Sequence, residues 1–239
     1  MFAYTIEILR PAIAAVLKEE SSSESFTWLV ALPVPPQNIT RDFSFASRKF
    51  SKQRPASSSA PHIYLAEKFQ RTHWHSWTIL DLARLYLLLQ LNAANEQEYT
   101  TTIESVFNQA DLGELTILYK ALPYFAYGKA WESRCAEGIR SNMGTVLEAI
   151  MYENSYPSVH LPEAAWNQLI LKAIFTGKDL GRIYGLEERN NAALAASLLD
   201  YAEERLAAGR NIDAAVWPLT KVFYPEKTGV LQQRFLQEK

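Results

Sequence analysis

The stretch that decides the fold is Asn191-Ala-Ala-Leu-Ala-Ala-Ser-Leu-Leu-Asp-Tyr-Ala-Glu-Glu-Arg-Leu-Ala-Ala208, which Gly209 follows. Its leucines and alanines recur every three to four residues, as the buried face of a helix requires. Asparagine is favoured at the start of a helix, because its side-chain oxygen accepts a hydrogen bond from an unpaired backbone N–H. Glycine is favoured just past the end, where the backbone turns left-handed. The stretch therefore predicts a helix over residues 191–208.

The same helical spacing is continuous from residue 76 onward. Ser76 is the expected N-cap of the first helix in this region. Asp111 and Glu114 stand three residues apart, as the two partners of a capping box do. Pro218 is expected to cut or bend a short helix that Asp213 caps. Together the patterns predict helices at 76–91, 99–107, 111–121, 129–139, 142–152, 162–175, 191–208, just after 213, and 226–236.

This pattern predicts an all-α fold of roughly ten to twelve short helices. Only 9 glycines occur in 239 residues, which favours packed helices over turn-rich sheets. Two architectures fit: an irregular helical repeat, that is, an α-α superhelix like a solenoid, or a globular bundle. The pairs Asp81-Leu82, Asp111-Leu112 and Asp179-Leu180 resemble each other, but no fixed period connects them.

The N-terminal third has a different texture. A helix is expected over residues 2–18, kinked or restarted at Pro11, and residues 26–33 read as a short helix or an extended connector. Between Pro33 and Pro61 the sequence is rich in proline, serine and basic residues. We interpret it as a long surface connection with a helical turn or two around 43–50, or as an ordered arm that touches an anionic ligand or partner. The expected division is an N-terminal helix plus connecting segment at 1–74, and one continuous helical domain at 75–239.

Charge and cysteine content exclude several classes of protein. The net charge is −2 and the cations are spread out, so no basic stripe for nucleic acid is expected. The most apolar stretch, 79–91, contains Asp81 and Arg84 and is too short to span a bilayer. Cys135 is the only cysteine, which excludes an internal disulfide and fits a reducing compartment. The expectation is a cytoplasmic protein without membrane insertion, of undetermined oligomeric state.

Catalytic and metal-binding motifs are missing from the sequence. His73 and His75 could ligate a metal, with His160 as the third donor, but no HExxH or carboxylate cluster accompanies them. The preferred interpretation is an aromatic plug, and no metal is predicted. The chain has no GxSxG, Walker loop or dinucleotide fingerprint, so no catalytic residue and no cofactor is assigned.

Polar residues are concentrated between Glu137 and Arg210. Lys172 stands in a helix that is otherwise nearly all apolar, so its ammonium either reaches solvent or meets an anion. One interpretation is a set of helix caps and surface ion pairs, and the other is a polar pocket for a phosphorylated or hydroxylated metabolite. The candidate ligand-binding residues are Arg140, Asn142, Asn154, His160, Asn167, Lys172, Asp200 and Arg205.

Several blocks in this half resemble the EboA family. They are Glu137-Gly-Ile-Arg-Ser-Asn-Met143, Asn154-Ser-Tyr-Pro157, Trp166-Asn-Gln-Leu-Ile-Leu-Lys-Ala-Ile-Phe175 and Asp200-Tyr-Ala-Glu-Glu-Arg-Leu-Ala-Ala-Gly-Arg210, with Asp111-Leu-Gly-Glu-Leu and Leu118-Tyr-Lys-Ala-Leu-Pro123 upstream. The resemblance covers residues 75–220. The segment from Pro33 to Pro61 has no place in it. Most of the candidate residues, together with Trp166, match recurring positions of the family, to which no role is attached.

The resemblance implies a setting rather than an activity. Members of the family are encoded beside a UbiA-type prenyltransferase and several enzyme-like proteins, in a bacterial cluster for secondary metabolism and precursor export. The resemblance therefore implies an accessory protein that binds a small metabolite or another protein of the cluster. Two alternatives stay open: an enzyme that uses Lys172, Asp200 and His160 on a cyclitol, sugar phosphate or prenylated precursor, and a protein-interaction scaffold.

Overall fold

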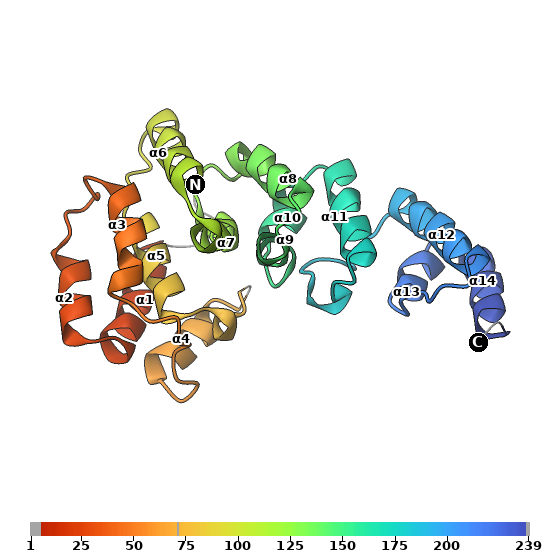
Figure 1. Cartoon of the computed structure of the whole chain (residues 1–239), viewed down its shortest axis with the longest axis horizontal. Helices are drawn as coiled ribbons and strands as arrows, with labels where there is room; N and C mark the ends of the chain where they lie inside the picture. Colours follow the sequence, from red (N-terminus) through yellow and green to blue (C-terminus); the bar gives the residue numbers. More distant parts are fainter. Residues whose placement is uncertain (1–5, 71, 238–239) are drawn as a thin grey trace. The chain divides into compact units, whose positions relative to one another are not determined.

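The computed structural model describes residues 6–70 and 72–237, and these form α-helices and short 3₁₀-helices with no strand among them (Figure 1). The all-α prediction is confirmed. The described residues contain fourteen α-helices, and all but the short α10 and α13 are seven residues or longer. The choice between an irregular repeat and a bundle stays a prediction.

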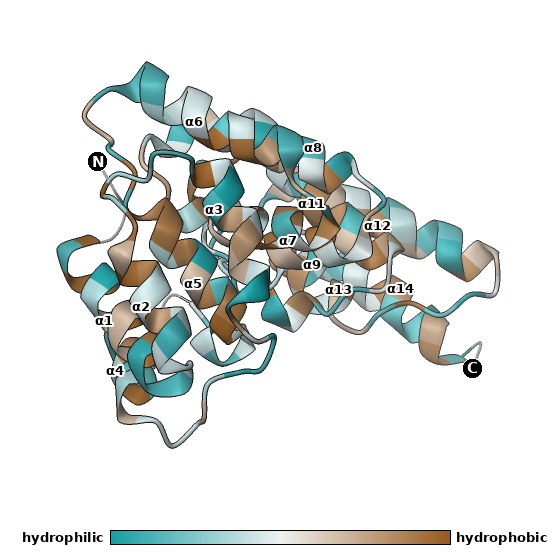
Figure 2. Cartoon of the chain, turned by 60° about the vertical axis from the view of Figure 1, so that its left-hand side comes forward, coloured by the Kyte–Doolittle hydropathy of each residue, from teal (hydrophilic) through white to brown (hydrophobic). Residues whose placement is uncertain are grey.

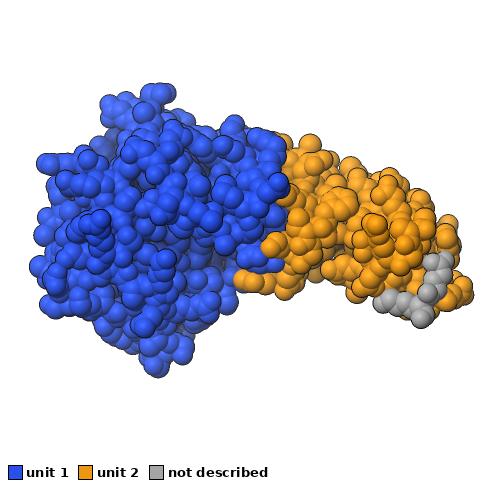
Figure 3. All heavy atoms as spheres, viewed as in Figure 1, with its two compact units in different colours: residues 1–156 blue, residues 157–239 orange. Residues whose placement is uncertain are grey.

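Contacts within the chain define two compact units, residues 1–156 and residues 157–239, which we call unit 1 and unit 2 (Figure 3). The expected division between residues 74 and 75 rests on composition and stays a prediction. Unit 1 contains α1 (Ile6–Glu20), α2 (Ser23–Ala31), α3 (Ile39–Phe45), α4 (Ala60–Lys68), α5 (Ile79–Leu88), α6 (Glu96–Gln109), α7 (Leu112–Lys120), α8 (Glu132–Arg140) and α9 (Gly144–Met151). Helix α10 (Tyr156–His160) begins at Tyr156, the last residue of unit 1, and continues into unit 2. Unit 2 continues with α11 (Glu163–Phe175), α12 (Ala192–Ala207), α13 (Val216–Lys221) and α14 (Pro225–Gln237).

The centre of unit 1 is α5, in which every residue except Tyr86 is buried. Helices α1, α3 and α7 pack against it, and α7 also packs against α9. Figure 2 shows the apolar residues of α5 as a mostly brown ribbon among these neighbours. Its first turn is fixed by Thr78, because Asp81 N donates to Thr78 Oγ1 and Thr78 N donates to Asp81 Oδ2, both at 3.1 Å. The prediction of Ser76 as the cap was wrong, since only Thr78 has an acidic partner three residues on.

The N-terminal third is more ordered than its composition indicates. Helix α1 continues through Pro11, and residues 2–5 of the expected helix lie outside the described residues. In the segment from Pro33 to Pro61 the expected helical turns around 43–50 are present as part of α3 and a 3₁₀ turn, but they bury Phe43 and Phe50 instead of lying on the surface, while residues 51–54 and 56–58 are exposed. Two aromatic side chains bury enough apolar area to draw a polar segment into the core.

Unit 2 is organised by α12, which packs against α11, α13 and α14. Its predicted caps are confirmed: Leu194 N donates to Asn191 Oδ1 at 2.9 Å, and Gly209 is left-handed with φ +61°. Helix α13 continues through Pro218, contrary to the prediction. Pro218 is the third residue of α13, where a backbone N–H has no partner within the helix, so a proline is tolerated.

Candidate ligand-binding site

Unit 2 contains a cavity of about 400 Å³, within the range of roughly 300–1,000 Å³ that small-molecule sites occupy. We call it the α13 cavity, because one wall is α13 and the residues on either side of it. The other wall is the stretch between α11 and α12. The lining residues are Leu180, Gly181, Leu186, Glu187, Asn190, Ala215, Pro218, Leu219, Val222 and Phe223.

Most of the α13 cavity is apolar and part of it opens to solvent. Val222 is 70% exposed and Phe223 is 39% exposed, although both have large apolar side chains. They follow α13 directly, where the chain turns toward α14, and neither side chain is drawn into the core. Exposed apolar side chains that gather around a cavity are typical of a binding site rather than of an ordinary surface.

Two polar side chains belong to this lining. The Asn190 amide nitrogen donates to the Leu219 carbonyl at 2.9 Å. This carbonyl lies near the end of α13, where it has no hydrogen-bond partner within the helix. The Asn190 Oδ1 is buried and has no hydrogen-bond partner among the described residues. Glu187 is exposed, and within the described chain its carboxylate forms no hydrogen bond or ion pair. The cavity therefore has one unpaired negative charge and no positive one.

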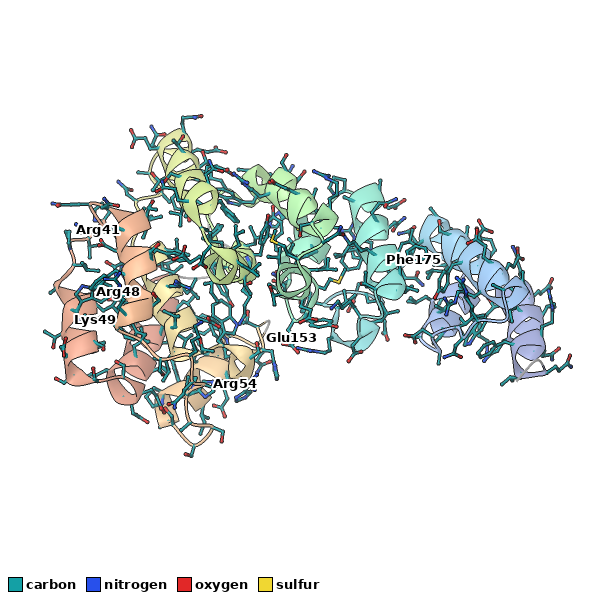
Figure 4. All side chains as sticks on the ribbon, in the orientation of Figure 1. Arg41, Arg48, Lys49, Arg54, Glu153 and Phe175 are labelled. Carbon is teal, nitrogen blue, oxygen red and sulfur yellow. The ribbon has the colours of Figure 1, made fainter. Side chains whose placement is uncertain are left out.

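A second polar site lies in unit 1, between α7, α9 and the turn before α5. Lys120 Nζ lies 3.1 Å from Asp81 Oδ2 and 4.6 Å from the centre of the Trp77 ring. Glu153, labelled in Figure 4, has a left-handed φ of 55°. Its carboxylate lies 3.1 Å from His73 Nδ1. The cavity among these residues measures about 20 Å³, room for a water molecule but not for a metabolite.

The buried ion pair and the buried thiol of unit 1 stabilise the fold and do not form a reactive site. Arg84 Nη2 donates to Glu114 Oε1 at 3.1 Å, and both side chains are buried. Burial lowers the pKa of Arg84, and the charge of Glu114 opposes that shift. Burial also raises the pKa of the Cys135 thiol well above its ordinary value, so the residue behaves as a small apolar side chain.

Three of the predicted site residues lie in unit 1 and are not gathered at one place. Arg140 and Asn142 are exposed at the end of α8 and in the turn after it. Asn154 is buried, and its amide nitrogen donates to the carbonyls of Tyr119 and Ala149 at 3.0 and 2.9 Å. Asn154 therefore joins α7 to α9.

The other five predicted residues lie in unit 2. Asn167 exchanges side-chain hydrogen bonds with Asn191, at 3.2 and 2.8 Å. Asp200 is exposed, with its carboxylate 4.0 Å from Lys227, and Arg205 donates to the backbone carbonyl of Asn211. His160 ends α10, and Lys172 is half-buried in α11. None of the eight lines the α13 cavity, and their role in binding stays a prediction.

Sequence reasoning missed Glu187 and Asn190. The signal for Asn190 is the pair Asn190-Asn191: one asparagine is enough to cap α12, so the other was available for a second purpose. Glu187 gave no such signal, because it stands beside Glu188 in a polar loop. Only the fold brings it to α13.

The histidines do not have the arrangement that the metal hypothesis required, in which His73, His75 and His160 would lie together. His75 contacts His62 and His73, with ring centres 4.9 and 5.6 Å apart, whereas His160 belongs to unit 2. Across residues 6–70 and 72–237, no group of three or more histidine, cysteine or acidic side chains is placed to hold a metal ion. His62 was the neighbour that the sequence spacing could not reveal.

The fold and the cavity define an all-helical protein whose C-terminal unit contains a cavity of about 400 Å³. The chain belongs to the EboA family: the family model described as "Metabolite traffic protein EboA" matches residues 12–221. The match extends upstream of the expected limit at residue 75 and includes the segment from Pro33 to Pro61. No curated protein and no solved structure matches the chain. No helix in the described part of the chain is long and apolar enough to cross a membrane.

Proposed function

We propose that this chain is an accessory protein of a bacterial secondary-metabolite pathway, and that it binds a small metabolite in the α13 cavity. The observation that carries the proposal is the cavity itself. Its volume suits a small molecule, and its lining is apolar with few polar groups, as in most small-molecule sites. A traffic role within the EboA family requires a site that holds a molecule and releases it.

Binding accounts for the cavity better than catalysis does. Glu187 is the one titratable group in the lining, and no second acid, base or nucleophile accompanies it there. General acid–base catalysis requires groups within hydrogen-bond reach of the reacting atoms. The residues of the enzymatic alternative, Lys172, Asp200 and His160, lie outside the lining.

Filling the cavity tests the proposal. Ala215 lines the cavity, whereas its neighbour Ala214 is exposed and does not, so Ala215→Phe and Ala214→Phe form a matched pair. Each protein would be purified gently from cells that express the rest of the gene cluster, then analysed by native mass spectrometry. We expect wild type and Ala214→Phe to retain a bound metabolite and Ala215→Phe to lose it.

Three controls and outcomes complete this experiment. Equal thermal unfolding midpoints for the two variants would show that both are folded. Equal metabolite content in both variants would overturn the proposal. A partner protein that copurifies with all three forms, without any metabolite, would instead support the scaffold alternative.

A further inference from the structure

We infer that the ligand of the α13 cavity is a mostly apolar molecule whose polar head donates hydrogen bonds or carries a positive charge, and is not an anion. This inference rests on the proposed function and specifies its ligand. It depends on the carboxylate of Glu187, on the uncharged character of Asn190, and on the absence of any cation beside them in the described lining.

The apolar part of the ligand follows from the walls. Leu180, Leu186 and Leu219 face the cavity from its two sides, and Val222 and Phe223 extend the apolar surface to solvent. A hydrocarbon body placed there removes both its own surface and these side chains from water. Each buried methylene group contributes about 0.8 kcal/mol, or roughly fourfold in affinity.

The head group follows from the balance of donors and acceptors. The ionised carboxylate of Glu187 is an acceptor only. The Asn190 amide nitrogen is engaged with the Leu219 carbonyl, and its oxygen is buried away from the open space of the cavity, so this side chain brings no charge to a ligand. An amine or hydroxyl head can donate to the Glu187 carboxylate, which lines the cavity and is exposed. A carboxylate or phosphate head would meet a like charge and no side-chain cation.

Arg189 is the cation nearest to Glu187 in sequence, and it does not neutralise the carboxylate. Arg189, two residues away, donates to the carbonyls of Ser158 and Leu161, and its guanidinium lies 5.1 Å from the centre of the Trp166 ring. Its charge is therefore held on the α10–α11 side of unit 2. Glu187 remains available to a ligand.

Three probes with the same octyl chain test the head group: octylamine, 1-octanol and octanoate. Isothermal titration calorimetry at neutral pH would give their dissociation constants. For the wild-type protein we expect octylamine to bind at least as tightly as octanol, and octanoate to bind roughly two- to fivefold more weakly than octanol, because its carboxylate would face the like charge of the exposed Glu187 with no cation in the described lining. Ala215→Phe should weaken octylamine and octanol together.

Adjacent glutamates supply the matched variants. Glu187 lines the cavity and Glu188 does not, and both are exposed. Glu187→Gln should weaken octylamine binding by roughly two- to fivefold, the factor that an exposed ion pair supplies, and leave octanol unchanged. Glu188→Gln should leave all three probes unchanged.

The outcomes separate this inference from the function on which it rests. Equal binding of all three probes, or tightest binding of octanoate, would overturn the head-group inference while the cavity remained a binding site. An equal loss of octylamine affinity in Glu187→Gln and Glu188→Gln would also overturn it. If no probe bound, and Ala215→Phe retained as much copurified metabolite as wild type, the proposed function would fail as well.

Discussion

The two units differ in how many polar side chains they bury. Among the described residues, eleven of the thirteen buried polar side chains belong to unit 1, and only Thr220 and Thr228 belong to unit 2. The Arg84–Glu114 pair of unit 1 is buried, whereas Lys227 of unit 2 meets Glu203 at the surface. Unit 1 adds buried polar side chains, such as the Arg84–Glu114 pair, to its apolar core, whereas unit 2 buries few polar side chains around α12 and has a cavity beside α13.

This difference indicates that unit 1 is the more rigidly specified unit and that unit 2 is better suited to hold a ligand. Buried polar bonds must be satisfied in one arrangement, so they specify that arrangement closely. Apolar walls with few polar bonds adapt more easily to a ligand. The cavity lies in the unit with fewer buried polar bonds, which is where a molecule that must enter and leave is most easily accommodated.

The largest expected effect comes from breaking the buried pair of unit 1. Arg84→Met leaves the Glu114 carboxylate buried without its cation and removes the hydrogen bond from Arg84 Nε to the Phe43 carbonyl, 3.1 Å long. An unpaired buried charge costs about 3–5 kcal/mol in the free energy of unfolding. Urea unfolding would measure the loss, and hydrogen exchange in α7 would locate it in unit 1.

The matched change in unit 2 is Lys227→Met, which removes an exposed cation 3.0 Å from Glu203. It should cost less than about 1 kcal/mol. If the two substitutions destabilised the protein equally, the contrast between the units would be wrong.

The next prediction compares the same change, glycine to alanine, in the two units. We expect it to destabilise unit 1 and to stabilise unit 2. A Cβ added at Gly138 in α8 would lie 2.4 Å from Ile150 Cδ1 and 2.7 Å from Tyr119 Cε1. Gly138→Ala should therefore destabilise unit 1 by about 1–3 kcal/mol. Gly229→Ala in α14 meets nothing within 4 Å, so it should stabilise the helix by about 0.5–1 kcal/mol. Thermal unfolding of the two variants tests the pair, and a shift in the same direction would contradict the expected packing.

The sequence was sufficient for the features that depend on local chemistry. The Asp111–Glu114 capping box and the Asn191 cap both occur as predicted, because each involves residues only three apart. Ser76 was the wrong choice because serine caps are common, and the decisive partner, Asp81, had to be matched with Thr78. Local patterns therefore predicted most of the helices from residue 76 onward, with errors of a few residues at their ends, but missed α4 and the short α10.

The site was not predictable in the same way. Glu187 and Ala215 stand far apart in sequence, and only tertiary packing brings them into one lining. Asn154 and Asn167 drew attention as polar residues in apolar surroundings, yet the structure gives both of them partners within the fold. A polar residue in an apolar stretch marks a hydrogen bond that must be made, and whether the partner is protein or ligand depends on contacts that sequence spacing does not contain.

A smaller effect tests how far unit 2 depends on its caps. Asn191→Ala removes the acceptor for Leu194 N and the donor to Asn167 Oδ1, so it should lower the stability of unit 2 by about 1–2 kcal/mol. Asn191→Asp keeps the cap and loses the donor, and should cost less. Hydrogen exchange in α12 would distinguish the two. Equal protection of α12 in both variants would assign no role to the cap.

The smallest effect is a dependence on pH that only unit 1 should show. Burial, with the nearby His62 and His73, lowers the pKa of His75 below its ordinary value of about 6.5. The unfolded chain then takes up a proton at His75 more readily than the folded protein, so this residue makes stability fall as the pH drops through and below 6.5. His75→Asn should flatten that part of the profile of unfolding midpoint against pH. Hydrogen exchange would place the change in α4 and α5 and leave α12 unaffected, whereas identical profiles for wild type and variant would exclude His75 as its source.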